Sequence, residues 1–447
     1  MTMRRRFHSI CLALFAPVFF PPLTASSAGF DYHRETIPGG GVLLVEESRE
    51  LPMVTIRVSI SAGARAEYPE NQGLANITAT LLARGTRRRS SAEIEKLNDQ
   101  LGGGIGIEAG RDFATASLRV LTKDIERGMD LLADVLRRPI FPKKEVEKSR
   151  RQIIGQLRRR KDQPSHLADV ALRKRIFGVH PYGRMVSGTP ESVQKMKRVD
   201  IQTFHRNWYG MKDAIFVFVG DISTSRAREL VLANFKGWRS GKANLPDISL
   251  EKPPDRLIVE KIDRTLTQTT VLFGNRSLKR KHPDFYAARV MNYILAGGGF
   301  ESRILNNIRE EKGLVYAAYS YFASGMDTGH WCLVLQTKNK SANEAIAESL
   351  AEIRRMQEKG VTEKELADAK SFITGNFSTR FLSSGRIAGY MLAIERLGFP
   401  SDYAFRYLER IRAVTKEQVQ ETAKKYIHPD EAVLAIVGNL SEAKLKY

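Results

Sequence analysis

The sequence predicts a two-domain α+β protein that arose by duplication of one domain. Its 447 residues are enough for two or more domains that each bury a core of their own. Segments of the first half return in the second half in the same order. Strand-like and helix-like patterns are mixed, and no glycine-rich phosphate loop follows a strand, which favours α+β layers over a doubly wound parallel sheet.

An apolar segment followed by glycine closes both halves. Residues 214–219 run into Gly220, and residues 432–437 run into Gly438. A tyrosine stands 11 residues before the first glycine and 12 before the second, each time in or just after a helix-like stretch. This order predicts the same helix-to-strand unit twice.

A second pair of matching segments lies further upstream in each half. Residues 141–145 and residues 361–365 each open a long polar helix. Around residues 237–255 the apolar periodicity stops, and Gly, Ser, Asn, Pro and Lys dominate, as in a linker. We therefore predict four segments along the chain, which are a signal peptide at 1–28, a first domain at 29–240, a linker at 241–256 and a second domain at 257–447.

Three stretches alternate apolar and polar residues and predict half-buried strands. They are residues 54–60, 114–120 and 331–336. Residues 125–136 and 342–356 have helical periodicity instead.

The N-terminal residues have the pattern of a secretory signal peptide. Three arginines at positions 4–6 precede an apolar run at 10–20 and small residues that end at Ala28. The run is too short to span a bilayer comfortably, so we expect no stable membrane anchor. Cleavage leaves Cys332 as the one cysteine, which excludes an internal disulfide. The pattern predicts a soluble exported protein, periplasmic in location.

The chain is strongly basic, with 71 Lys and Arg against 50 Asp and Glu, a net charge of +21 and a pI near 9.9. Such an excess attracts polyanions. The basic residues are spread along the whole chain, and no zinc-knuckle, helix-turn-helix or RNP-like motif accompanies them. We therefore expect a solvated basic surface and no nucleic-acid partner, with polyanion binding as a weaker alternative.

Residues 70–86 predict an amphipathic helix. Leu74, Ile77 and Leu81 mark one face, and Gly85 is the expected end. In outline this segment resembles the zinc-binding helix of the M16 (insulinase-like) peptidases, an apolar helix that carries H-x-x-E-H and ends in a glycine-threonine pair.

The resemblance places the family's zinc site on residues that are not metal ligands. The two histidine positions fall on Asn76 and Thr80, the glutamate between them on Ala79, and the third ligand on Gln156. Neutral oxygens are poor donors for Zn²⁺, and alanine cannot accept a proton from a bound water. We therefore expect no metal or other cofactor in this chain. The eight histidines form no alternative motif, and none is assigned as a ligand; they are His8, His33, His166, His180, His205, His282, His330 and His428.

Residues 295–316 give the closest match to the same family. Glycines precede Ser302, a candidate helix cap, the helix is expected to end at Gly313, and a strand is expected at 314–322. The M16 peptidases carry an arginine and a tyrosine seven residues apart in such a segment. Here these are Arg309 and Tyr316.

The resemblance implies that Arg309 hydrogen-bonds a peptide carbonyl near the scissile bond and that Tyr316 stabilises the developing oxyanion. A helix-terminal arginine can instead only offset the helix dipole, and a strand tyrosine can belong to the core. The implied fold is two similar α+β domains of the LuxS/MPP-like type, each a mixed or antiparallel sheet with helices on one face.

Three functions follow as expectations. The first is a non-catalytic subunit, inactive on its own, that forms a heterodimer or larger complex with a catalytic M16 chain carrying H-x-x-E-H and zinc, and helps it bind peptide substrates. The second is a scaffold or peptide-binding pseudoenzyme with no catalytic partner. The third is the polyanion binder already mentioned.

Overall fold

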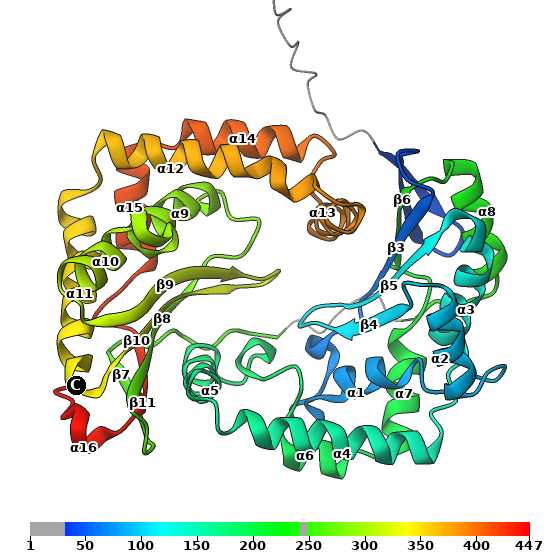
Figure 1. The fold of residues 1–447 in the computed structure, drawn as a ribbon, viewed down its shortest axis with the longest axis horizontal. Helices are drawn as coiled ribbons and strands as arrows, with labels where there is room; N and C mark the ends of the chain where they lie inside the picture. The colour runs from blue at the N-terminus through cyan, green and yellow to red at the C-terminus, as the bar shows by residue number, and fades with distance from the viewer. Residues whose placement is uncertain (1–31, 242–247) are drawn as a thin grey trace, which may run out of the picture.

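Two β-sheets, one in each half of the chain, form the framework of the structure, a computed structural model that describes residues 32–241 and 248–447 (Figure 1). The predicted signal peptide at 1–28 lies outside the described residues. The first sheet has the order β1-β2-β6-β3-β5-β4. Its strands are β1 (His33–Ile37), β2 (Gly41–Glu47), β3 (Met53–Ile60), β4 (Ile105–Ala109), β5 (Ala114–Leu121) and β6 (Ile215–Gly220).

The second sheet repeats this order without an equivalent of β1. Its order is β7-β11-β8-β10-β9. In each sheet one neighbouring pair is parallel, β2 with β6 and β7 with β11, and the remaining pairs are antiparallel. The shared order and polarity confirm the duplicated α+β architecture. The strands are β7 (Ile258–Asp263), β8 (Gln268–Ser277), β9 (Val315–Ser324), β10 (Gly329–Lys338) and β11 (Val433–Gly438).

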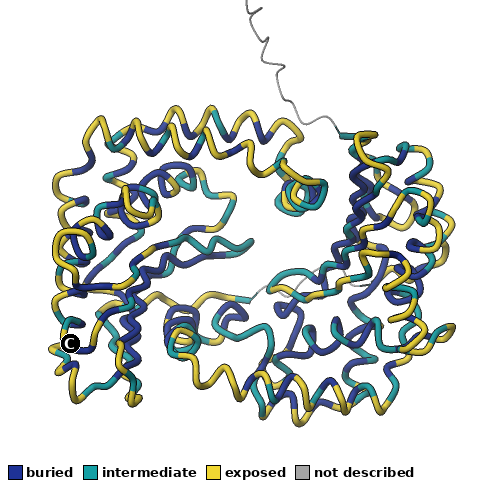
Figure 2. The backbone as a smooth tube through the Cα atoms, viewed as in Figure 1, coloured by how far each residue is buried: buried dark blue, intermediate teal, exposed yellow. Residues whose placement is uncertain are grey.

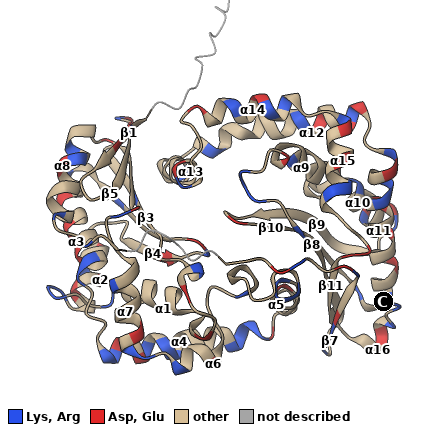
Figure 3. Cartoon of the chain, turned by 180° about the vertical axis from the view of Figure 1, so that it is seen from behind, with Lys and Arg blue, Asp and Glu red and all other residues tan. Residues whose placement is uncertain are grey.

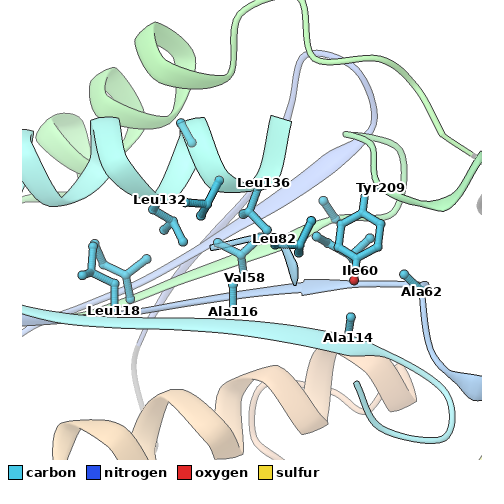
Figure 4. Close-up of a cluster of buried hydrophobic side chains, with 14 of the residues drawn as sticks. Val58, Ile60, Ala62, Leu82, Ala114, Ala116, Leu118, Leu132, Leu136 and Tyr209 are labelled. Atoms are coloured by element: carbon cyan, nitrogen blue, oxygen red, sulfur yellow. The ribbon is translucent and has the colours of Figure 1, made fainter. Parts of the chain in front are cut away.

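Helices of the first half cover one face of the first sheet. Apolar residues of α3 recur at helical spacing, and Figure 4 shows Leu132 and Leu136 pointing toward Val58 of β3. All three side chains are fully buried. The helices are α1 (Leu74–Leu81), α2 (Ser91–Gln100), α3 (Ile125–Arg137), α4 (Lys143–Arg160), α6 (Pro190–Lys195), α7 (Arg198–Trp208) and α8 (Thr224–Phe235).

The second half builds its own core in the same way. Trp331 of β10 is its largest fully buried side chain, and its Nε1 donates to Asn292 Oδ1 at 2.8 Å. The helices are α9 (Phe285–Asn292), α10 (Arg303–Leu305), α11 (Ala342–Lys359), α12 (Glu363–Gly375), α14 (Tyr403–Ala413), α15 (Lys416–Tyr426) and α16 (Leu440–Ala443).

Two further helices cross between the halves. Helix α5 (Pro164–Phe177) follows α4 and packs on β8 and β11 of the second sheet, with Leu172 buried beside Leu272. Helix α13 (Ser384–Leu397) follows α12 and packs on β6 of the first sheet, with Met391 buried beside Val217 (Figure 1). Each half therefore covers part of the other half's sheet, at equivalent places in the repeat.

This exchange corrects the prediction for two of the three strands. Residues 114–120 alternate in burial as predicted. Residues 54–60 do not, because α13 covers their polar face, and Thr55 and Ser59 are only 5% and 1% exposed. Residues 331–336 of β10 are buried almost throughout, because α5 covers their second face; Figure 2 shows the strands of both sheets mostly in the colour of buried residues.

The predicted linker at 241–256 lies between α8 and β7, and its residues 242–247 fall outside the described part. Within the described ranges, no helix has both the length and the apolar character needed to cross a membrane.

Candidate functional site

Helix α1 starts from an unusual N-terminus. Gly73 has a φ of 94°, a left-handed conformation, and the backbone N–H groups of Gly73 and Ala75 donate to the Glu67 carboxylate at 3.0 and 2.7 Å. A carboxylate at this place satisfies donors that have no partner inside the helix. The helix ends at Leu81 rather than near Gly85 as predicted. Beyond it the chain continues through a turn to Thr86, which forms an isolated bridge with Pro139.

The four positions matched to the zinc site do not act as one group. Asn76 and Gln156 line a common pocket of about 280 Å³ between α1 and α4. Ala79 and Thr80 do not line it. Ala79 is buried, and the Thr80 hydroxyl donates to the Asn76 carbonyl oxygen at 2.9 Å, so it is already used by its own helix.

The residues of this pocket do not fit Zn²⁺. Asn76 and Gln156 offer neutral amides, which are weak ligands for this ion. Two guanidinium groups, those of Arg111 and Arg160, line the same pocket and repel a cation. No group of three or more His, Cys, Asp or Glu side chains with a metal-binding arrangement occurs in the described residues. The pocket cannot supply the chemistry of a hydrolytic metal centre.

Glu67 is the most perturbed acid near α1. It is 5% exposed, and burial raises the pKa of its carboxyl to about 8, although the two backbone N–H groups and Arg184 favour the ionised form. Its position at the start of α1 was not predicted. No motif marks Glu67. The one available signal is that it precedes the predicted helix by a few residues.

The stability of the protein should therefore depend on the charge of Glu67. The folded state holds this proton more tightly than the unfolded state, so deprotonation favours unfolding. The free energy of unfolding is expected to fall as pH rises from about 4.5 to about 8, by at most about 1.4 kcal/mol per pH unit. Urea titrations at several pH values measure this slope. Glu67→Gln should remove most of it, and Glu70→Gln, at an exposed site, should not; equal slopes in both variants would contradict the assignment.

Arg309 lies in a π-helical turn, Asn306–Glu311, at the end of the helix predicted there. Its guanidinium group stands 4.8 Å from the ring centroid of Phe300 and 3.7 Å from a Glu310 oxygen, and its side chain is 38% exposed. Ser302 was predicted to cap the helix with its side chain, and this prediction is wrong. Its hydroxyl donates to the Gly299 carbonyl oxygen instead. Arg309 thus stays within reach of solvent.

Tyr316 is exposed because of a bulge in β9. Thr337 pairs with Val315 and the adjacent Gln336 pairs with Ala317, so Tyr316 is an extra residue with no partner on β10. Bulges redirect side chains, often next to functional sites. Tyr316 is 72% exposed, which excludes the alternative that it belongs to the core.

Neither Arg309 nor Tyr316 lines the α1 pocket. They lie in the second half, beside the edge strand β9, whereas the pocket lies in the first half beside the edge strand β4 (Figure 1). Among the described residues, no hydrogen bond, ion pair or ring contact joins the two places.

Three histidines of the described residues are buried and packed among other side chains. His180 is fully buried and its Nδ1 accepts from the Tyr182 N–H at 3.2 Å. Burial lowers the pKa of His205 to about 4 and that of His330 to about 3, which keeps both rings neutral. None of the three joins a metal-binding group.

Two family models match the chain. One, described as "Insulinase (Peptidase family M16)", matches residues 42–190, and the other, described as "Peptidase M16 inactive domain", matches residues 195–373. Together they cover most of both halves.

Curated relatives carry two different kinds of name. A Bacillus subtilis protein named "Uncharacterized zinc protease YmxG" is 26% identical over 408 residues, which cover 90% of this chain and 97% of that protein. A Helicobacter pylori protein named "Non-peptidase homolog YmxG" is 24% identical over 425 residues, which cover 92% and 95%. The neutral side chains at the zinc positions of this chain agree with the second name.

Solved structures share the fold. The "peptidase M16 inactive domain from Pseudomonas fluorescens" has a TM-score of 0.84 and 27% identity, over 91% of this chain and 98% of that one. A chain of complex III from Candida albicans has a TM-score of 0.77 at 17% identity, over 93% of this chain and 97% of that one. The second likeness concerns the fold alone.

Proposed function

The chain belongs to the M16 (insulinase) peptidase family as an inactive-type member, and from this premise we propose that it is the non-catalytic subunit of a heteromeric M16 zinc peptidase. In this role the partner chain supplies the zinc, the water-activating glutamate and the bond cleavage. This chain supplies part of the surface that binds the peptide substrate.

One observation carries the proposal. The residues that would make a zinc site are replaced, while the side chains of Arg309 and Tyr316 stay exposed. Within the chain, Arg309 contacts Glu310 at 3.7 Å and the ring of Phe300. The exposure of the tyrosine on its bulge and of the arginine just before the same strand supports contact with a ligand outside the chain. Arg309 would hold a peptide carbonyl, and the Tyr316 hydroxyl would donate to the oxyanion that forms at the partner's metal.

Three features belong to the same proposal. The chain binds no zinc of its own, the complex is a heterodimer or larger, and both subunits are exported. The support for export is the charge and apolar pattern of residues 1–28.

Reconstitution tests the proposal. The mature chain is purified alone, then mixed with a catalytic M16 chain that carries H-x-x-E-H from the same organism, and cleavage of a quenched fluorescent peptide is followed. We expect no cleavage by this chain alone and a large gain in rate when the two are combined. Capture of unrelated proteins only, with no gain in rate, would instead support a scaffold.

A further inference from the structure

The pocket beside α1 is positively charged. Arg111, in the turn between β4 and β5, and Arg160, the last residue of α4, line it together with the amides of Asn76 and Gln156. The remaining lining residues carry no charge; they are Ala109, Ile153, Leu157, Met185, Val186 and Ser187. A pocket with two cations and no acid attracts anions.

Backbone carbonyl oxygens hold Arg111 at the pocket wall. Its Nη1 donates to the carbonyl oxygens of Tyr182 and Arg184 at 3.3 and 3.2 Å. Burial lowers the pKa of its guanidinium group, and the nearby Arg173 adds to this effect. Asp169 and Asp112 act in the opposite direction from beyond ion-pair distance. Arginine nevertheless stays charged in proteins, so a half-buried cation here gains from an anion. No carboxylate among the described residues lies within ion-pair distance of it.

Arg160 approaches the same pocket from α4. Its Nη1 stands 3.5 Å from the Ser187 hydroxyl, and it forms no ion pair with the described residues. Basic residues recur along α4, as Figure 3 shows, but its neighbours Arg158 and Arg159 do not line the pocket. Arg160 is free to reorient toward a bound group.

The edge strand β4 leads to this pocket. It ends at Ala109, which lines the pocket, and its outer edge has no partner strand among the described residues. An extended peptide that pairs with such an edge is held by main-chain hydrogen bonds. A carboxylate carried by that peptide would then meet the donors of Arg111, Arg160 and the two amides.

We propose that the α1 pocket binds a carboxylate group of a peptide, so that a place matched to a metal site has become an anion site. The carboxylate belongs either to a peptide C-terminus or to an Asp or Glu side chain, which present the same two oxygens. This inference goes beyond the proposed function, because it concerns a pocket that neither Arg309 nor Tyr316 lines and it needs no catalytic partner.

Peptide binding to the isolated full chain tests the proposal. A short Thr/Val peptide with an N-terminal fluorescent label is prepared as the free acid, as the C-terminal amide, and as the amide with one internal glutamate. Fluorescence anisotropy gives each Kd. We expect at least one acidic form to bind about tenfold more tightly than the neutral amide. Preference for the free acid assigns the pocket to a C-terminus, and preference for the glutamate form assigns it to a side chain.

Single variants locate the effect. Arg111→Gln should weaken binding of the preferred acidic peptide about tenfold, and the exposed Arg160→Gln about threefold. Arg159→Gln removes the same charge from the neighbouring position outside the pocket and should leave the Kd nearly unchanged. Equal Kd values for the three peptides would overturn the proposal, and so would an Arg159→Gln loss as large as that of Arg160→Gln. Either result leaves the reconstitution experiment unaffected, so the two proposals fail separately.

Discussion

Tyr316→Phe is expected to lower kcat of the reconstituted peptidase by about 10²–10³, with little change in KM. The variant removes only the hydroxyl of an exposed side chain, so the fold should be unaffected. The loss is that of one oxyanion donor, which acts in the transition state and not in the ground state. Steady-state cleavage of a quenched fluorescent peptide measures both constants.

A nearby tyrosine provides the control. Tyr319→Phe removes a hydroxyl from the same strand at a site that is 50% exposed, and it should leave kcat within about twofold. Arg309→Ala should lower kcat/KM by about 10–100-fold, since a charge-assisted hydrogen bond to the peptide is lost. An unchanged kcat in Tyr316→Phe, or an equal loss in Tyr319→Phe, would show that Tyr316 does not have this role.

Arg396→Ala is expected to destabilise the chain by about 2–4 kcal/mol. Arg396 of α13 is 6% exposed, donates to the Ser59 hydroxyl at 3.0 Å and to Asp213 at 2.9 and 3.0 Å, and stacks over Phe113 at 4.2 Å. Burial lowers its pKa to about 10, and Asp213 opposes that shift. The variant removes the arginine donor from three acceptors of the first half, the Ser59 hydroxyl and the carbonyl and carboxylate oxygens of Asp213. The Asp213 carboxylate keeps the Ser61 hydroxyl as a donor and is exposed enough to recover water.

Urea unfolding followed by tryptophan fluorescence measures this effect. Arg386→Ala serves as the control, because Arg386 is an exposed residue of the same helix whose side chain donates to the Thr379 carbonyl oxygen. It should change the free energy of unfolding by less than about 0.5 kcal/mol. Equal stability of the two variants would mean that α13 does not anchor the second half to the first sheet.

The repeat in the sequence predicted the duplicated architecture because strand and helix periodicities are local properties. The segments ending at Gly220 and Gly438 became the equivalent strands β6 and β11. The exchange of α5 and α13 could not be predicted, because nothing local to a helix says which sheet it covers. Thr55 and Ser59 are buried by that long-range contact. From the sequence alone, their alternation with apolar residues wrongly indicated a side of the strand that faces solvent.

The features of the candidate site also fall into two groups, those that residue identity indicates and those that depend on the fold. Residue identity alone supports the prediction that Asn76, Ala79, Thr80 and Gln156 are no zinc ligands, since the argument rests on their donor atoms. The exposure of Tyr316 was not predictable, because it depends on a bulge that forms where β9 and β10 change register. No sequence pattern distinguished Arg160 from the other basic residues, and its convergence with Arg111 at one pocket is visible only in the fold.

Zinc content tests the central claim most directly. The mature chain is purified without a histidine tag and equilibrated with zinc, and the bound metal is counted by mass spectrometry alongside a proteolysis assay with and without chelator; a catalytic M16 chain serves as the positive control. The donor set of the α1 pocket predicts far less than one zinc per chain and no proteolysis in either condition. One zinc per chain, together with proteolysis that the chelator abolishes, would contradict the account.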